Sequence, residues 1–310
     1  METIAFYYSP KFLEHHPGRG HPEESDRLQA VLARLPELPL TRIEPEPVPR
    51  SQLLAVHSEA HLAGLEAVHA RGGGALDPDT AMSAGSWPAA LLAAGAAAQA
   101  VELVLSHAGP RRAFCAVRPP GHHATRERAM GFCLLNNVAV AAARALTLGL
   151  SRVAIVDFDV HHGNGTQEIF YEEGRVLYVS THQYPYYPGT GAARETGLGA
   201  GAGKTLNLPL PAGAADAAYR EVLANALLPA LEAFAPELLL LSAGFDAHEA
   251  DPLGGLALTT SMFGELTRAL VGVAERYAAG AVVSCLEGGY DRPALGACVA
   301  AHLAALAGAG

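Results

Sequence analysis

The chain has 310 residues, of which 50% are hydrophobic and 17% are charged, so it can bury a large core and has little composition typical of disorder. Its net charge of −10 disfavours nonspecific nucleic-acid binding and is only weakly compatible with a cationic substrate, because many proteins are acidic for solubility alone. The four cysteines form no CxxC pair, and the N-terminus METIAFYYSP lacks a basic region followed by an apolar stretch, so we expect a reducing, cytoplasmic location.

Short apolar runs alternate with longer helix-like stretches. Several runs, such as VAIVDF, are apolar without alternation, which is typical of strands covered by helices on both faces. The repeated order predicts an α/β fold, a single doubly wound domain over residues 1–310 with a mostly parallel central sheet. The expected strands are Ile4–Tyr8, Ala113–Val117, Val153–Phe158, Val176–Ser180, Thr205–Leu208, Leu238–Ser242 and Ala281–Leu286.

Six helices are expected between or after these strands. The most apolar window, Ala89–Leu105, carries Gln99 and Glu102, which favours a buried helix over a membrane span, so no membrane partner is expected. The helices are Ser25–Leu35, Ser86–Ser106, Leu135–Leu148, Ala214–Phe234, Thr259–Tyr277 and Pro293–Leu306.

Polar clusters follow four of the predicted strands. In open parallel sheets, ligands bind just beyond the carboxyl ends of the strands, so these clusters are the candidate site. They are RPPGHHA with His122 and His123, DFDVHHGNG with Asp157, Asp159, His161 and Asn164, SAGFDAHEAD with Asp246, and EGGY with Tyr290.

The Asp-x-Asp-x-His spacing points to a metal. Residues at i, i+2 and i+4 of a strand project to the same side, so Asp159 and His161 could chelate one ion, with Asp157 on that face if the strand continues. Two carboxylates, one of them from another strand, and an imidazole leave a coordination position open, as in catalytic zinc sites. Any one cluster could equally cap a loop, but four at strand ends favour a shared site.

The adjacent histidines have side chains that should diverge, which suits proton transfer better than joint metal binding. Tyr290 follows two glycines that permit a tight loop, and its hydroxyl could donate to a developing oxyanion. A loop tyrosine is weak evidence in isolation.

The motifs RPPGHHA, GFCLLNN, DFDVHHGNGTQ, SAGFDAHEADPLGG and LEGGY resemble the consecutive motifs of the histone deacetylase family. This family includes bacterial deacetylases, acetylpolyamine amidohydrolases and acetoin-utilisation proteins. The resemblance runs from HPEESDRL near residue 21 to about residue 290, and it implies an arginase/deacetylase-like fold.

The resemblance implies one zinc ion per chain, held by Asp159, His161 and Asp246, whose bound water attacks an amide carbonyl that Tyr290 also polarises. It makes His122 and His123 a base and acid pair, with His123 protonating the leaving amine. It also pairs Asp157 with the first histidine and Asn164 with the second. Because an amide stabilises imidazolium less than a carboxylate does, we expect the lower pKa in the pair of His123 with Asn164.

A narrow substrate channel is also implied. Phe132 and Tyr187 match its two aromatic walls, and the second wall is Phe in many relatives. Asp79 falls where relatives hold the substrate backbone, Arg27 matches an arginine near the inner acetate cavity, and Leu253 lies near the mouth. The resemblance further implies a structural potassium ion bound by Asp157, main-chain oxygens of Asp159 and His161, and Ser180.

Several functions remain open at this point. Acetyl-lysine in a peptide or protein is favoured over an acetylated polyamine or another small acylated amine, because Leu253 replaces a Glu that some polyamine enzymes carry, although Asp79 and Glu249 could compensate. A ureohydrolase with two manganese ions is disfavoured, because the paired histidines would have no role in it. A catalytically silent binding module is disfavoured too, because it would need neither the metal ligands nor the histidines nor Tyr290. Oligomeric state is not readable from the sequence.

Two other patterns are interpreted as structural. The segment GLGAGAGKT, residues 197–205, resembles a phosphate loop, but Leu198 replaces the required glycine and a strand-like run follows. His57 and His61 are four residues apart, but no Glu follows His57 as in HExxH, so we expect surface or capping histidines. His15, His16, His69, His107 and His302 receive no role.

Overall fold

In the computed structural model, residues 1–106 and 108–308 are described, so His107 lies outside the described residues. Eight strands form one sheet in which all neighbouring strands are parallel. The sheet order is β2 (Leu40–Ile43), β1 (Ile4–Tyr7), β5 (Arg112–Cys115), β10 (Val282–Leu286), β9 (Leu238–Ala243), β6 (Val153–Asp157), β7 (Val176–Gln183) and β8 (Thr205–Leu210).

The seven predicted strands are all present, and the predicted parallel α/β sheet is confirmed. Six of them, β1, β5, β6, β7, β9 and β10, are buried along their whole length, because helices cover both faces. Strand β2 was not expected, because its LTRI sequence is short and partly exposed at the edge of the sheet.

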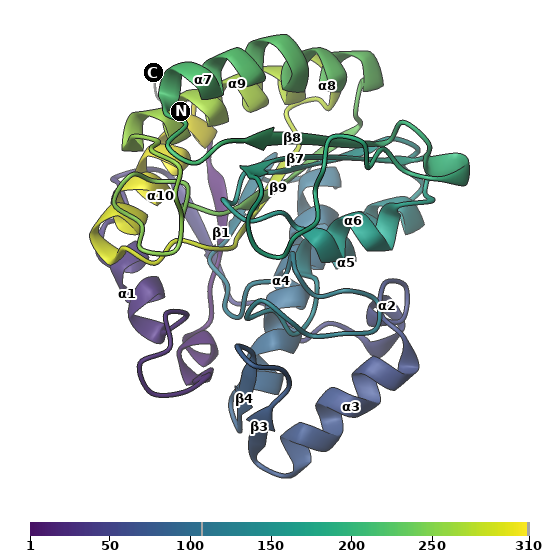
Figure 1. Ribbon diagram of the computed structural model, residues 1–310, viewed down its shortest axis with the longest axis vertical. Helices are drawn as coiled ribbons and strands as arrows, with labels where there is room; N and C mark the ends of the chain where they lie inside the picture. The colour runs from purple at the N-terminus through teal and green to yellow at the C-terminus, as the bar shows by residue number, and fades with distance from the viewer. Residues whose placement is uncertain (107, 309–310) are drawn as a thin grey trace.

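Helices cover the two faces of the sheet (Figure 1). On one face lie α4 (Ser86–Leu105) and α5 (Asn137–Thr147), which pack together, and on the other lie α1 (Ser25–Ala33), α9 (Thr260–Tyr277) and α10 (Arg292–Leu306). Helix α4 is long and apolar enough to cross a membrane by composition, but most of it is buried inside the protein. The prediction of a buried helix there is confirmed.

The predicted helix Ala214–Phe234 is interrupted. It consists of α7 (Asp216–Val222), a π turn η3 (Leu223–Leu227) and α8 (Leu228–Phe234). Pro229 stands in the first turn of α8 and has no N–H to donate to the preceding turn, which accounts for the break in the α-helical pattern there.

Some short elements were not expected from the sequence. A β-hairpin of β3 (Gly73–Ala75) and β4 (Ala81–Ser83) follows α3 (Glu59–Ala70) and stands outside the main sheet (Figure 1). The glycine-rich loop at residues 197–205 contains only the short turn η2 (Gly199–Gly201) and leads into strand β8, so the phosphate-loop pattern is correctly set aside. The other short elements are η1 (Pro10–Glu14), α2 (Arg50–Leu53) and α6 (Asn164–Phe170).

The four strands that precede the predicted polar clusters, β5, β10, β9 and β6, are consecutive neighbours in the sheet. Their carboxyl ends meet along one edge, because all of them run in the same direction. Segments far apart in the sequence therefore converge at a single place.

Candidate active site

Asp159, His161 and Asp246 each offer one ligand atom, and these atoms all lie within 4.8 Å of one another. The expected convergence arises differently from the strand geometry assumed for the sequence, because β6 ends at Asp157. Beyond it, the Asp159 N–H donates to the Asp157 Oδ1 (3.3 Å), and the His161 N–H donates to the Asp159 Oδ1 (2.9 Å). These successive turns, in which a carboxylate accepts from the N–H two residues on, bring the side chains together.

Asp246 lies in the loop that follows the neighbouring strand β9, which ends at Ala243. Its Oδ1 accepts a hydrogen bond from the Val160 N–H (2.8 Å), whereas its buried Oδ2 has no hydrogen-bond partner among the described residues and lies 3.2 Å from the His161 Nδ1. A Cβ atom at Gly288 would lie 2.1 Å from this Oδ2, so only glycine lets the loop after β10 pass here. An unpartnered, buried carboxylate oxygen facing an imidazole nitrogen fits a bound cation.

The electrostatics of Asp246 and His161 support the same interpretation. Burial raises the pKa of Asp246, and the neighbouring Asp159 raises it further. Burial opposes the charge on His161, but the adjacent carboxylates of Asp159 and Asp246 raise its pKa well above the usual range. A divalent cation bound by two oxygens and a nitrogen would satisfy both carboxylates without a proton, and this donor set suits zinc.

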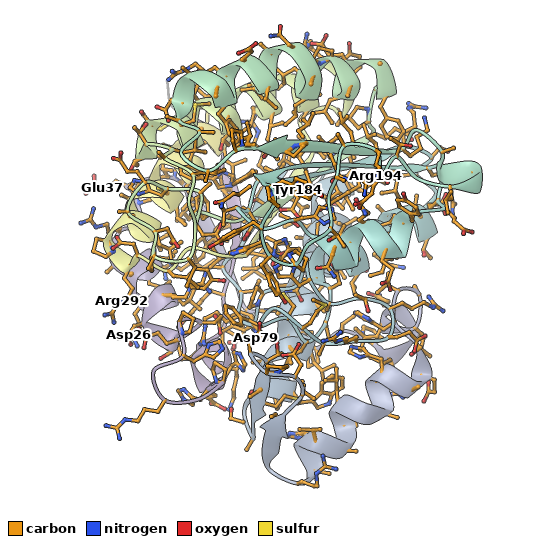
Figure 2. The ribbon with its side chains drawn as sticks, viewed as in Figure 1. Asp26, Glu37, Asp79, Tyr184, Arg194 and Arg292 are labelled. Carbon is orange, nitrogen blue, oxygen red and sulfur yellow. The ribbon has the colours of Figure 1, made fainter. Side chains whose placement is uncertain are left out.

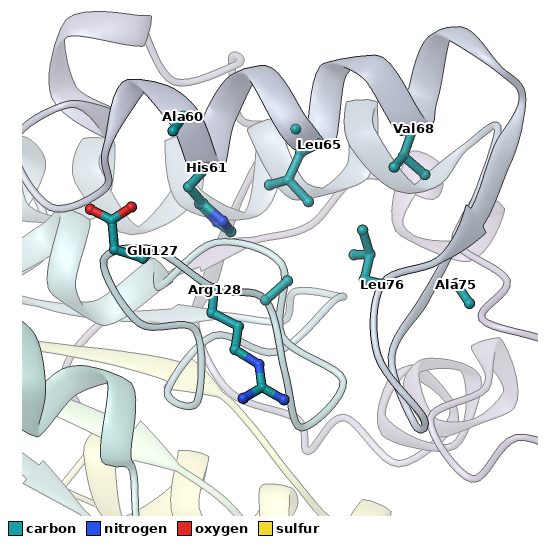
Figure 3. Close-up of a pocket in the computed structure, with 10 residues that line it drawn as sticks. Ala60, His61, Leu65, Val68, Ala75, Leu76, Glu127 and Arg128 are labelled. Carbon is teal, nitrogen blue, oxygen red and sulfur yellow. The ribbon is translucent and has the colours of Figure 1, made fainter.

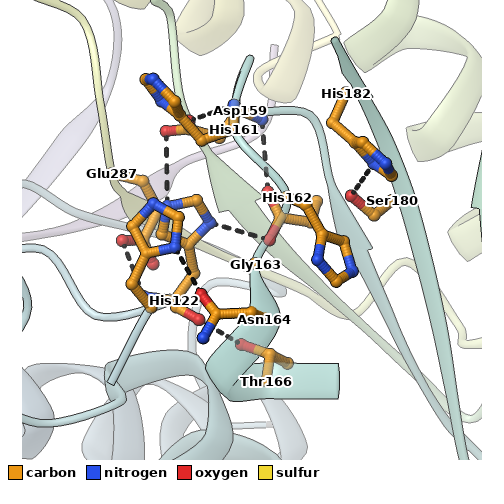
Figure 4. A network of polar contacts seen from close by, with 12 residues as sticks. His122, Asp159, His161, His162, Gly163, Asn164, Thr166, Ser180, His182 and Glu287 are labelled. Atoms are coloured by element: carbon orange, nitrogen blue, oxygen red, sulfur yellow. Dashed lines mark hydrogen bonds and ion pairs between the residues drawn. The ribbon is translucent and has the colours of Figure 1, made fainter. Parts of the chain in front are cut away.

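The paired histidines make two separate contacts. The His122 Nδ1 lies 3.0 Å from the Asp157 Oδ2, and the His123 Nδ1 lies 2.8 Å from the Asn164 Oδ1 (Figure 4). The expectation that the two side chains diverge is wrong, because their ring centroids are only 4.0 Å apart. The His122 Nε2 faces the ligand cluster, 3.9 Å from the Asp159 Oδ2.

The two pairs differ electrostatically in the expected direction. Burial opposes the charge on His122, but the carboxylates of Asp157 and Asp159 outweigh it and raise the pKa of His122 to about 10. Burial lowers the pKa of His123 well below its usual range, the nearby His122 lowers it further, and Asn164 contributes only a hydrogen bond.

Tyr290 stands at the loop after β10 and lines the cavity beside these groups. Burial raises the pKa of its hydroxyl well above the usual value, so the hydroxyl stays a donor. The buried Arg27 lies 4.8 Å from the ring centroid of Tyr290 and donates to the carbonyl oxygens of Glu287 and Gly289 (2.6 Å each). Arg27 does not line the cavity. Instead, its hydrogen bonds hold the loop that carries Tyr290.

A cavity of about 180 Å³ leads to the ligand cluster. The Phe132 ring meets the Tyr290 ring edge-on at 5.9 Å, and the Tyr187 ring meets His123 edge-on at 5.2 Å, so two aromatic side chains stand at the sides. Asp79, labelled in Figure 2, lies at the wall, where the Thr80 hydroxyl donates to its Oδ1 (2.8 Å). The lining residues are Asp79, His123, Gly131, Phe132, His161, Tyr186, Tyr187, Leu253 and Tyr290.

Two side chains in this region escaped the sequence analysis. Tyr186 stacks on His161 at 5.6 Å and donates its hydroxyl to the Leu253 carbonyl (3.1 Å); the doubled tyrosine of YPYYPG was a signal for it. Glu287 is fully buried, and its Oε2 accepts from the Gly121 N–H (2.7 Å) and the His122 N–H (3.2 Å). In the sequence, Glu287 could have been noticed as a charged residue directly after the apolar strand Val282–Leu286.

Two of the residues expected to bind potassium, Asp157 and Ser180, lie next to each other in the sheet. Asp157 and Ser180 are register partners on β6 and β7, and both are fully buried. The Ser180 Oγ lies 2.8 Å from the His182 Nδ1 (Figure 4).

Of the two roles expected for His57 and His61, surface or capping, the surface position is wrong, because both are buried with their rings 4.9 Å apart, whereas contacts with loop backbone agree with capping. The His57 Nε2 accepts from the Asn136 N–H (2.9 Å), and the His61 Nε2 lies 2.9 Å from the Leu134 carbonyl. They fix the loop that leads into α5. His61 also lines a larger cavity of about 380 Å³ between α3 and residues 127–129, which none of the predicted site residues lines (Figure 3).

Known proteins resemble this chain over most of its length. Residues 21–306 match the Histone deacetylase domain family. A probable deacetylase of Archaeoglobus fulgidus is 41% identical, with 92% of this chain and 80% of the relative covered. A histone deacetylase-like amidohydrolase of Pseudomonas aeruginosa is 40% identical, with coverages of 84% and 69%.

A solved structure agrees with these relatives. The HD domain of HDA15 superposes with a TM-score of 0.93 at 36% identity, covering 99% of this chain and 88% of that one. The arginase/deacetylase-like fold expected from the motifs is thereby confirmed. From the domain match and these relatives together, the chain belongs to the histone deacetylase family.

Proposed function

We propose that this chain is a zinc-dependent deacetylase that hydrolyses the acyl–nitrogen bond of acylated lysine side chains. Family membership supports hydrolysis of acylated amines in general. The observation that carries the finer proposal is the unpartnered Asp246 Oδ2, which faces the His161 Nδ1 beside Asp159 at the inner end of an aromatic-walled cavity. Zinc held by these three residues would polarise the substrate carbonyl and activate water.

The remaining groups have roles that follow from their partners. The Tyr290 hydroxyl donates a hydrogen bond to the carbonyl oxygen as negative charge develops there. The Asp157 carboxylate stabilises the charged form of His122, whereas the Asn164 amide does not do so for His123. We therefore assign proton transfer to His123, which takes a proton from the attacking water and delivers it to the leaving amine. His122 stays charged and stabilises the negative charge nearby.

The residues that line the cavity suit the narrow, apolar methylene chain of an acylated lysine. Phe132 and Tyr187 would contact the methylene groups of the lysine side chain, while the acyl group reaches the ligand cluster. Asp79 would accept a hydrogen bond from the substrate backbone at the wall. Arg27 would act through the tyrosine loop that it supports.

The test is hydrolysis of a fluorogenic acetyl-lysine peptide by the protein as purified, after chelation, and after zinc is restored. We expect loss on chelation, recovery with zinc, and one zinc per chain by elemental analysis. Asp246→Asn should lower both zinc content and activity, with Glu221→Gln as a control at an exposed acidic position on α7. Two manganese ions per chain, or no hydrolysis with zinc restored, would contradict the proposal.

An acetylated polyamine is the second candidate substrate. The Asp79 carboxylate at the cavity wall favours it, because a cationic amine pairs with a carboxylate, whereas the apolar Leu253 favours acyl-lysine. The values of kcat/KM for an acetyl-lysine peptide and for acetylated polyamines, measured side by side, decide between them. We further propose that residues 1–310 act as one domain in the cytoplasm, with potassium bound near Asp157 and Ser180.

A further inference from the structure

Glu287 links two parts of the active site that come from different strands. It follows β10 directly and lies three residues before Tyr290, and its side chain reaches the loop that follows β5. It is fully buried but does not line the substrate cavity. Its contacts are therefore with the protein alone.

The main chain of Glu287 is fixed at both its polar groups. Its N–H donates to the Ala243 carbonyl at the end of β9 (2.9 Å), and its carbonyl accepts from the Arg27 Nη2 (2.6 Å). The base of the side chain is thus held by neighbours from β9 and α1. The carboxylate extends from a fixed point.

The other end of this side chain holds the histidine turn. The Oε2 accepts hydrogen bonds from two successive N–H groups, those of Gly121 (2.7 Å) and His122 (3.2 Å). On the opposite side of His122, its carbonyl accepts from the N–H groups of Gly165 and Thr166 at the start of α6 (3.1 Å each). The main chain of His122 is therefore fixed between Glu287 and α6, and its ring is directed toward Asp157.

We propose that Glu287 is a positioning residue whose side-chain length, rather than its charge, sets the spacing between the His122–His123 turn and the Tyr290 loop. Only one carboxylate oxygen makes hydrogen bonds, because the buried Oε1 has no partner among the described residues. A neutral side chain of equal length could accept both hydrogen bonds through its single carbonyl oxygen, although more weakly than a carboxylate oxygen does. Burial raises the pKa of Glu287 to about 7, although the neighbouring His122 and the Gly121 N–H favour its charged form.

Two variants separate length from charge. Glu287→Gln keeps the length and one acceptor oxygen but removes the charge, whereas Glu287→Asp keeps the carboxylate and is shorter by one methylene. The catalytic readout rests on the proposed deacetylase function. We expect kcat of the Gln variant within about threefold of the parent, and a loss of up to about 10²-fold for Asp, because a displacement of about 1 Å can cost that much. The KM should change little in both, since Glu287 does not line the cavity.

A second readout does not depend on catalysis. Hydrogen exchange of a peptide covering residues 119–124 reports on the Gly121 and His122 N–H groups. We expect parent-like protection in the Gln variant and faster exchange in the Asp variant, with unchanged exchange in α9 as an internal control. If the Asp variant fails to fold while the Gln variant is active, the length requirement is supported in the same way.

The proposal is overturned if Asp matches the parent in kcat and protection, or if Gln loses as much as Asp. If the parent does not hydrolyse acyl-lysine at all, the proposed function fails, but the hydrogen-exchange comparison still tests the role of Glu287. The two failures are therefore distinguishable.

Discussion

Because His302 is buried and has a lowered pKa, we predict that it makes the protein less stable in acid. It lies in α10 with its ring against Phe114, Phe158 and Phe245, and its nitrogens contact the Thr267 and Ser284 hydroxyls at 2.7 and 2.9 Å. Burial lowers the pKa of His302 to about 3. An unfolded chain would bind this proton with a pKa of about 6.5.

The sign of the effect follows from where the proton binds. Between pH 6.5 and pH 3 the unfolded state holds more protons than the folded state, so stability falls as the pH falls through this window. At pH 5.5, about one unit below the unfolded pKa, His302 alone lowers the free energy of unfolding by about 1.4 kcal/mol relative to pH 7.5.

The perturbation is His302→Gln, which removes the titrating group and keeps a donor and an acceptor. Urea unfolding at pH 7.5 and pH 5.5, with chelator throughout so that metal binding does not contribute, gives the loss of free energy for each variant. We expect this loss to be smaller by about 1.4 kcal/mol in the variant than in the parent. His16→Gln, at an exposed position, is the control for removing an imidazole. An equal loss in parent and His302→Gln would refute the reasoning.

Three further changes test the site. Tyr290→Phe should lower kcat about 10²–10³-fold with little change in KM, measured by steady-state kinetics, because it removes one oxyanion donor; an unchanged kcat would remove Tyr290 from the chemistry. Asn164→Asp should raise the pKa of His123 and move the ascending limb of the kcat/KM–pH profile up by about 1–3 units; no movement of either limb counts against that pairing. Gly288→Ala would bring a Cβ within 2.1 Å of the Asp246 Oδ2, so zinc affinity measured by competition with a chelator should fall, whereas unchanged affinity would show that the loop yields.

The sequence predicts the sheet well where burial is complete. Runs such as Val153–Asp157 are apolar because helices cover both faces, and that signal is local. The edge strand β2 and the buried His57 are different cases. Within the described part of the chain, strand β2 lies at the edge of the sheet and pairs only with β1, and the buried His57 accepts a hydrogen bond from Asn136, which lies 79 residues away in the chain. Contacts between residues so far apart in the chain cannot be predicted from the local sequence around either residue.

The candidate site shows the same division. The order of the motifs indicates which residues converge, but not how they do so: β6 ends at Asp157, and hydrogen-bonded turns, rather than a pleated strand, place Asp159 and His161. Glu287 could not be assigned from the sequence, because its partners are backbone N–H groups, which carry no sequence signature.

The position of β10 has a consequence for how the two halves of the sheet are joined. It is the last strand in the chain, yet it lies between β5 and β9. Without β10, the sheet would divide into two parallel groups, one of β2, β1 and β5 and one of β9, β6, β7 and β8, because no other described strand pairs with both β5 and β9. Asp159, His161 and Asp246 follow strands of the second group, His122 and His123 follow β5 of the first, and Tyr290 follows β10 itself, so the pairing of this last strand with both groups assembles the cavity.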